Sequence, residues 1–137
     1  MKGLPGLVRL NQFKLDEARR QLAALETLAD DFRRQIVAID AEVRREADVA
    51  RESEEGARLY AAFLTATRAR RQRLDNSLAE VTRQVGEAHA HVTNAFQELK
   101  RYQLALDARE KRQAEHVRRA DQIRTDEIGL NVFRRRS

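Results

Sequence analysis

One stretch, residues 8–50, constrains the fold more than any other part of the sequence. Its positions spaced alternately three and four residues apart are apolar, except for Asn11 and Glu46. An average spacing of 3.5 residues places such a stripe on one side of a helix and winds it around a partner helix. The stripe runs through Val8, Asn11, Leu15, Ala18, Leu22, Leu25, Ala29, Phe32, Ile36, Ile39, Val43, Glu46 and Ala50.

A second stripe with the same spacing follows a break at residues 51–56. The break lacks large apolar residues and ends in Gly56, a natural helix terminator. Two stripes joined by a short turn predict an all-α antiparallel coiled-coil hairpin, with helix 5–53, turn 54–57 and helix 58–127. The second stripe runs through Tyr60, Leu64, Thr67, Arg71, Leu74, Leu78, Val81, Val85, Ala88, Val92, Ala95, Leu99, Tyr102 and Leu106.

The two stripes also predict a register. Pairing positions whose numbers add to 110 sets large residues against small ones in several layers, as where Leu15 meets Ala95. This register brings Met1 near Arg109, so we expect the second helix to overhang the first. We expect one hairpin domain over 1–127, followed by a flexible C-terminal tail at 128–137.

The composition agrees with long helices and excludes several kinds of site. Charged residues make up 36% of the chain and aromatic residues 5%, with one Pro and no Cys, a profile typical of coiled coils. Without Cys there can be no disulfide, zinc–thiolate site or Cys nucleophile. No apolar run approaches the ~18 residues of a membrane span, and no signal-peptide core is present. We therefore expect a cytoplasmic protein.

The charge is unevenly distributed along the chain. Residues 1–56 carry 10 Lys/Arg and 12 Asp/Glu, a net −2, whereas residues 57–137 carry 17 and 10, a net +7. The second half is therefore expected to prefer an acidic partner surface.

No residue pattern indicates catalysis. His89 and His91 are two residues apart and diverge on a helix, and the five Gly residues do not form a phosphate-binding loop. A two-helix hairpin also lacks a concave pocket that excludes water. We predict no enzymatic activity, no cofactor and no metal site.

Three places remain as candidate recognition surfaces. At the hairpin tip, Tyr60 and Leu64 belong to the stripe, and Phe63 beside it either caps the stripe or docks a partner. The other two places are the basic overhang and the apolar tail, for which a solvated helix face and a frayed terminus are the alternatives. Their residues are Arg112, Arg118 and Arg119 in the overhang, and Ile128 and Leu130 in the tail.

The chain resembles the flagellar type III export protein FliJ family nearly from end to end. The resemblance depends on the ordered combination of several short segments, none of them a catalytic signature. These segments are Phe13-Lys-Leu-Asp-Glu-Ala-Arg-Arg20, Tyr60-x-x-Phe-Leu64, Ala95-Phe-x-Glu-Leu-Lys100 with Asp107-x-Arg109, and Asp126-Glu-Ile-Gly-Leu130.

This resemblance implies a function. FliJ-like proteins are similar to the central stalk of rotary ATPases, and they link the hexameric export ATPase to the export gate and handle export chaperones. It implies that Arg112, Arg118 and Arg119 contact acidic loops of the ATPase ring. Tyr60, Phe63 and Leu64 would dock the cytoplasmic domain of the gate. The expected location is the cytoplasm, peripheral to the inner membrane at the flagellar base, with a role in motility and chemotaxis.

Three other interpretations remain open. The chain could be a coiled-coil scaffold or adaptor without an ATPase partner, since stripe and charge are common to both. Nucleic-acid binding through the basic second half ranks low, because no recognition motif or stacking aromatic residues accompany the charge. Two chains could also pair with each other in place of one hairpin.

Overall fold

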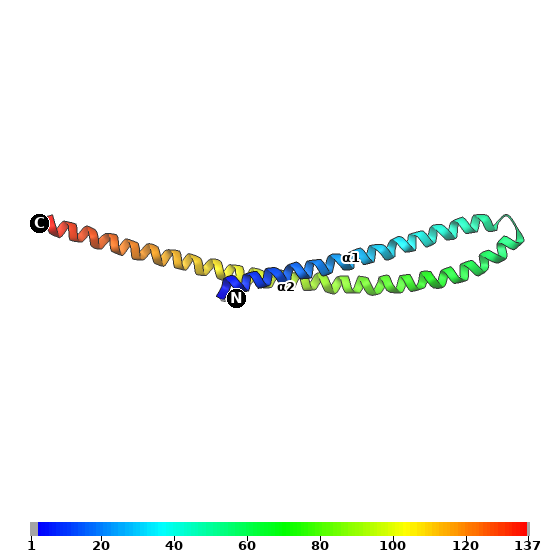
Figure 1. The fold of residues 1–137 in the computed structure, drawn as a ribbon, viewed down its shortest axis with the longest axis horizontal. Coiled ribbons are helices and arrows are strands. Elements are labelled where there is room, and N and C mark those ends of the chain that lie inside the picture. Colours follow the sequence, from blue (N-terminus) through cyan, green and yellow to red (C-terminus); the bar gives the residue numbers. More distant parts are fainter. Residues whose placement is uncertain (1–2, 137) are drawn as a thin grey trace. The chain divides into compact units, whose positions relative to one another are not determined.

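The computed structural model describes residues 3–136, which form two long α-helices and no strand. Helix α1 spans Gly3–Ala50 and helix α2 spans Glu54–Arg136 (Figure 1). The chain packs as two units: a hairpin unit of Leu15–Asn94, and a terminal unit whose described parts are residues 3–14 and 95–136. The predicted all-α antiparallel hairpin is confirmed. Neither helix, over the residues described, is long and apolar enough to cross a membrane.

The hairpin unit is held together by the two predicted stripes, which lie side by side along α1 and α2. Every predicted stripe position in this unit except Glu46 is fully or partly buried. Burying one large aliphatic side chain contributes about 1.5–3 kcal/mol, so this seam supplies most of the stabilisation. The fully buried residues of the unit are Leu15, Ala18, Ala29, Ile36, Ile39, Thr67 and Val81.

Two ion pairs between the helices lie close to the predicted register. Asp40 pairs with Arg71 at 2.8 Å, and Glu42 lies 3.7 Å from Arg70. The paired numbers, 40 with 71 and 42 with 70, add to 111 and 112. Both sums lie within two residues of 110, the offset expected when a long Arg side chain reaches along its helix.

The terminal unit continues the same seam. Leu99 of α2 and Asn11 of α1 are fully buried at stripe positions. Asn11 is polar, but its Nδ2 donates a 2.8 Å hydrogen bond to the carbonyl oxygen of Leu7 one turn earlier. This bond lowers the cost of burying an amide in the seam.

Within the terminal unit, α2 extends beyond the start of α1, as predicted (Figure 1). Gly3 begins α1 with a φ of 73°, a left-handed conformation that glycine adopts readily, and it lies beside Arg109. Met1, the predicted neighbour of Arg109, lies outside the described residues. Residues 107–136 are exposed at every position, and we call this part of α2, which runs beyond the start of α1, the overhang.

The turn lies earlier than the sequence analysis predicted, at residues 51–53 instead of 54–57. The Oγ of Ser53 accepts a 2.9 Å hydrogen bond from the backbone N–H of Gly56, which caps the N-terminus of α2. Glu54 and Glu55 occupy the first turn of α2, where their charge interacts favourably with the helix dipole. The predicted turn residues are therefore the start of a helix.

Gly56 does not terminate a helix, contrary to the prediction. It lies in the first turn of α2, close to the end of α1. A Cβ at this position would lie 3.0 Å from the Oγ of Ser53 and 3.5 Å from the Cα of Ala50. The absence of a side chain therefore permits the tight turn.

The C-terminal segment is also helical, which corrects the predicted flexible tail at 128–137. Helix α2 continues past the predicted end at residue 127 as far as Arg136, and Ser137 lies outside the described residues. No Pro interrupts this segment, and an isolated Gly129 costs only about 1 kcal/mol relative to Ala. Three Arg residues in the last turn interact favourably with the negative end of the helix dipole.

The burial pattern makes a stability prediction at two neighbouring positions of α1. Ile39 is 1% exposed and Val37 is 65% exposed. Ile39→Ala should lower the free energy of unfolding by about 2–5 kcal/mol, because it leaves a cavity in the seam. Val37→Ala should change it by less than about 0.5 kcal/mol. Urea unfolding followed by circular dichroism checks both values; equal losses would contradict this assignment of the seam.

Candidate interaction surfaces

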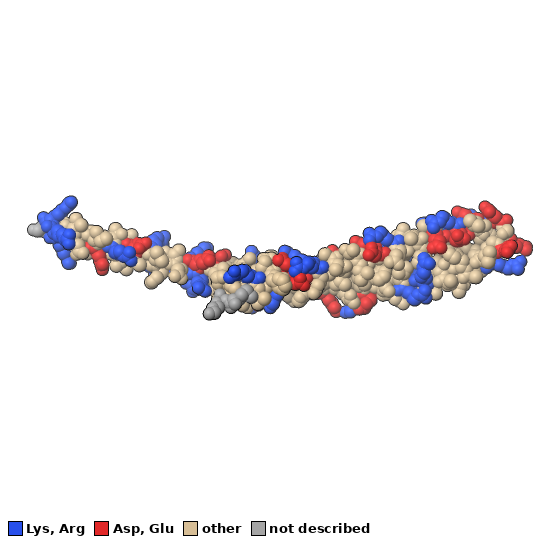
Figure 2. Space-filling view, in the orientation of Figure 1, with Lys and Arg blue, Asp and Glu red and all other residues tan. Residues whose placement is uncertain are grey.

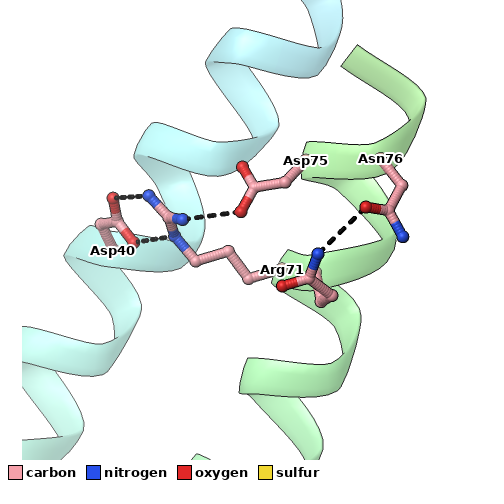
Figure 3. A network of polar contacts seen from close by, with 5 residues as sticks. Asp40, Arg71, Asp75 and Asn76 are labelled. Atoms are coloured by element: carbon pink, nitrogen blue, oxygen red, sulfur yellow. Dashed lines mark hydrogen bonds and ion pairs between the residues drawn. The ribbon is translucent and has the colours of Figure 1, made fainter. Parts of the chain in front are cut away.

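A polar cluster interrupts the apolar seam of the hairpin unit. Arg71 occupies a stripe position, where its Nε and one terminal nitrogen donate hydrogen bonds of 2.8 and 3.1 Å to the two carboxylate oxygens of Asp40 across the seam (Figure 3). Its other terminal nitrogen donates a 2.9 Å hydrogen bond to Asp75, one turn further along α2. We call Asp40, Arg71 and Asp75 the polar clamp. It joins the two helices where the stripe is polar.

The clamp changes the acidity of its members. Hydrogen bonds from Arg71, together with its positive charge, hold the pKa of Asp40 below the usual value for an aspartate. The same contact with Asp40, and the charge of Asp75, raise the pKa of Arg71. On the outer face of α2, hydrogen bonds from Arg83 and then Gln84 lower the pKa of Glu80.

Removing the guanidinium should restore the ordinary acidity of Asp40. In Arg71→Gln the pKa of Asp40 should rise towards the usual value for an aspartate. Because the folded-state pKa of Asp40 is depressed, the clamp's stabilisation is present above the unfolded-state pKa and lost as pH falls through the folded-state pKa. Carboxyl-carbon NMR titration measures the shift. Arg20→Gln serves as the control. If the pKa of Asp40 rises equally in that variant, Arg71 is not the cause of its low value.

The predicted tip residues lie together near the turn of the hairpin unit. Tyr60, Phe63 and Leu64 are each half-buried, and the rings of Tyr60 and Phe63 are 6.4 Å apart and tilted by 33°. Phe63 is therefore partly covered by the hairpin unit and partly exposed. A shallow groove of about 190 Å³ lies beside them. It is lined by Glu46, Val49, Ala50, Gly56, Leu59, Tyr60 and Phe63.

Two exposed apolar side chains at the tip fall outside the stripe pattern. Leu59 is 66% exposed and Val49, on the other helix, is 56% exposed. Val49 was missed in the sequence because a single apolar residue on an outer helix face carries no periodic signal. With Leu59 it gives the groove an apolar rim.

The predicted basic residues of the overhang are exposed, but they do not share one face. Arg112 and Arg119 are seven residues apart and lie on the same side of α2, whereas Arg118 is turned about 100° from Arg119. Arg119 pairs with Glu115 at 2.8 Å. Arg112 and Arg118 form no ion pair with any described residue.

The predicted apolar residues of the tail are also exposed, on opposite sides of the helix. Ile128 is 59% and Leu130 56% exposed, and two residues of helix turn the chain by about 200°. Basic side chains gather at this end of α2 (Figure 2), where Arg134, Arg135 and Arg136 form the last turn. The end of the overhang is thus both apolar and basic around its circumference.

The terminal unit contains a groove that the sequence analysis did not identify. It lies where α1 begins beside α2 and has a volume of about 560 Å³. Its lining includes Pro5, Leu106, Gln113, Ala114 and Val117. The seam face of α2 continues past Pro5, where α1 no longer accompanies it. This continuation is the sequence signal that could have revealed the groove.

One histidine of the hairpin unit lies close to a carboxylate on the other helix. His89 lies 3.5 Å from Glu26 across the hairpin unit, and both side chains are largely exposed. No group of three His, Cys, Asp or Glu residues within 3–136 is arranged to hold a metal ion.

Comparison with known families decides the identity. The sequence model described as "Flagellar FliJ protein" matches residues 1–137. The chain belongs to the FliJ family. This membership confirms the resemblance found in the sequence and makes the protein a component related to flagellar export. No curated protein and no solved structure matches the chain.

In this FliJ-family chain, the candidate surfaces are confined to separate units. Tyr60, Phe63 and Leu64 belong to the hairpin unit, whereas the overhang arginines and the apolar residues near the C-terminus belong to the terminal unit.

Proposed function

We propose that this FliJ-family protein is a non-enzymatic stalk of the flagellar type III export apparatus. It binds the hexameric export ATPase through its overhang, docks the cytoplasmic domain of the export gate through its tip, and handles export chaperones. It acts in the cytoplasm, peripheral to the inner membrane at the flagellar base, and thereby supports motility and chemotaxis. Family membership over the whole chain, together with the exposed overhang, is the observation that carries the proposal.

The distribution of residues on the overhang supports a partner that surrounds it. A flat partner surface needs apolar residues on one helix face, but Ile128 and Leu130 lie on opposite sides. The arginines likewise point in more than one direction. A helix of this kind fits the axial hole of a ring whose inner loops are acidic, because every side of the helix then meets the partner.

The tip supports a second contact of a different kind. Tyr60 and Phe63 supply aromatic area, and exposed Leu59 and Val49 extend it. Aromatic side chains that are partly buried and partly exposed are favoured as anchors in protein interfaces. The tip is thus suited to an apolar docking contact, in contrast to the basic overhang.

Neutralising the overhang should weaken binding to the ATPase. We expect the combined change Arg112→Gln, Arg118→Gln and Arg119→Gln to raise the Kd for the export ATPase hexamer about tenfold at low salt, equivalent to about 1.4 kcal/mol. It should also reduce the stimulation of ATP hydrolysis by the protein. Calorimetric titration and a coupled ATPase assay measure the two effects.

A matched control separates a specific contact from general charge. Arg20→Gln, Arg33→Gln and Arg34→Gln remove the same charge from the hairpin unit, where these arginines pair with neighbouring carboxylates. If both triple variants lose affinity equally, the overhang is not the ATPase-binding element. If the wild-type protein neither binds nor stimulates the ATPase, the chain is a scaffold without an ATPase partner.

The tip is tested by a single truncation. Phe63→Ala should weaken binding to the gate's cytoplasmic domain about tenfold, because it removes a docking side chain. The helical content should not change. Phe13→Ala, an exposed aromatic residue in the terminal unit, is the control. Loss of helicity in Phe63→Ala would instead assign the ring to the seam.

A further inference from the structure

The hairpin unit lacks a buried core near its tip. Among the described residues, none between Ile39 on α1 and Thr67 on α2 is fully buried. Beyond these positions the fully buried residues resume, with Ile36 on α1 and Val81 on α2. The 40–66 segment, which we call the tip segment, therefore contributes only partly buried side chains to the seam.

The stripe residues of the tip segment explain this weakness. Glu46 occupies a stripe position and is exposed. Ala50 fills its position with a single methyl group, and only Val43, Tyr60 and Leu64 contribute larger apolar side chains, all of them half-buried. Segments with few buried apolar contacts open locally at a lower free energy than the whole fold.

The polar clamp lies at the border between this weak segment and the core. Asp40 follows Ile39 directly, and Arg71 lies one turn beyond Thr67. Arg71 holds Asp40 through two hydrogen bonds across the seam, and its second partner, Asp75, keeps the guanidinium in place on α2 (Figure 3). Opening that starts at the turn must break this bidentate contact before it can reach the core.

We propose that the tip segment opens as one unit as far as the polar clamp, and that this opening exposes its apolar residues to the partner. The clamp is the boundary of the motion. The second half of the proposal rests on the proposed function of the tip. In the closed form Tyr60 and Leu64 are half-buried against the other helix, and separating the helices increases the apolar area that a partner can cover.

Amide hydrogen exchange of the whole chain, resolved by residue with NMR, tests the opening without any partner. Amides in 43–50 and 57–66 should exchange at least tenfold faster than those in 25–39 and 74–88, at rates similar to one another. Fraying of the helix ends would instead give a gradual change limited to the first turn on either side. Protection in the tip segment equal to that of the core would overturn the proposal.

The boundary is tested by weakening the clamp. Asp40→Asn removes the charge that holds Arg71 and should add residues 38–42 and 68–73 to the fast-exchanging set, with at least fivefold faster exchange. Asp30→Asn, which breaks an ion pair between Asp30 and Arg33 on α1 alone, should leave those amides unchanged. If both variants behave alike, the clamp does not limit the opening.

The coupling to binding is tested by closing the tip. Glu46→Leu fills the exposed stripe position and should slow exchange of the tip segment at least fivefold. It should weaken binding to the gate's cytoplasmic domain by a similar factor, because the open form becomes rarer. Glu87→Leu on the outer face of α2 makes the same chemical change, and should alter neither quantity.

The outcomes distinguish this inference from the proposed function. If Glu46→Leu slows exchange and leaves gate-domain affinity unchanged, the tip binds in its closed form and the coupling is refuted. If the wild-type chain does not bind the gate domain, the proposed docking role fails, while fast exchange bounded by the clamp still establishes the opening.

Discussion

The fold depends on the burial of one narrow apolar stripe against another. Such a stripe can satisfy only one helical neighbour, and most side chains outside it are exposed. The small and large residues that alternate across the seam fix the helices in one register. Asn11, Thr67 and Arg71 show that polar residues are accepted in the seam, and for Asn11 and Arg71 the structure provides hydrogen-bond partners. Because folding buries the stripe residues against each other, the apolar surface that a partner could contact lies where the seam weakens or ends.

Two such segments, the overhang and the tip, differ in chemistry. At the overhang the neighbouring helix has ended, so α2 presents apolar and basic side chains on all sides. At the tip both helices are present, but Glu46 and Ala50 leave little to bury between them. The first situation suits a partner that encloses a helix, and the second suits a partner that competes with one helix for the other.

Much of this architecture could be predicted from the sequence because heptad spacing indicates directly which side of a helix is buried against a partner. The predicted stripe positions, the overhang and the approximate register all follow from it. Heptad spacing does not indicate where each helix begins and ends. Ser53 was read as part of α1, although Ser followed by two Glu residues is a typical helix start. Arg71 was included in the second stripe without a partner, since periodicity does not reveal that Asp40 lies opposite it. Residues 128–137 were expected to form a flexible tail because they lie beyond the seam, and propensity alone did not reveal that the helix continues.

The missing core near the turn also bears on how the chain folds. A hairpin with strong contacts beside its turn can form outward from the turn, because each new contact closes only a short loop. Here the first fully buried positions on either side are Ile39 and Thr67. The loop of roughly thirty residues between them must close before burial in the apolar seam begins to offset the loss of chain entropy. The nucleus for folding is therefore expected in the middle of the hairpin unit, with the turn completed late.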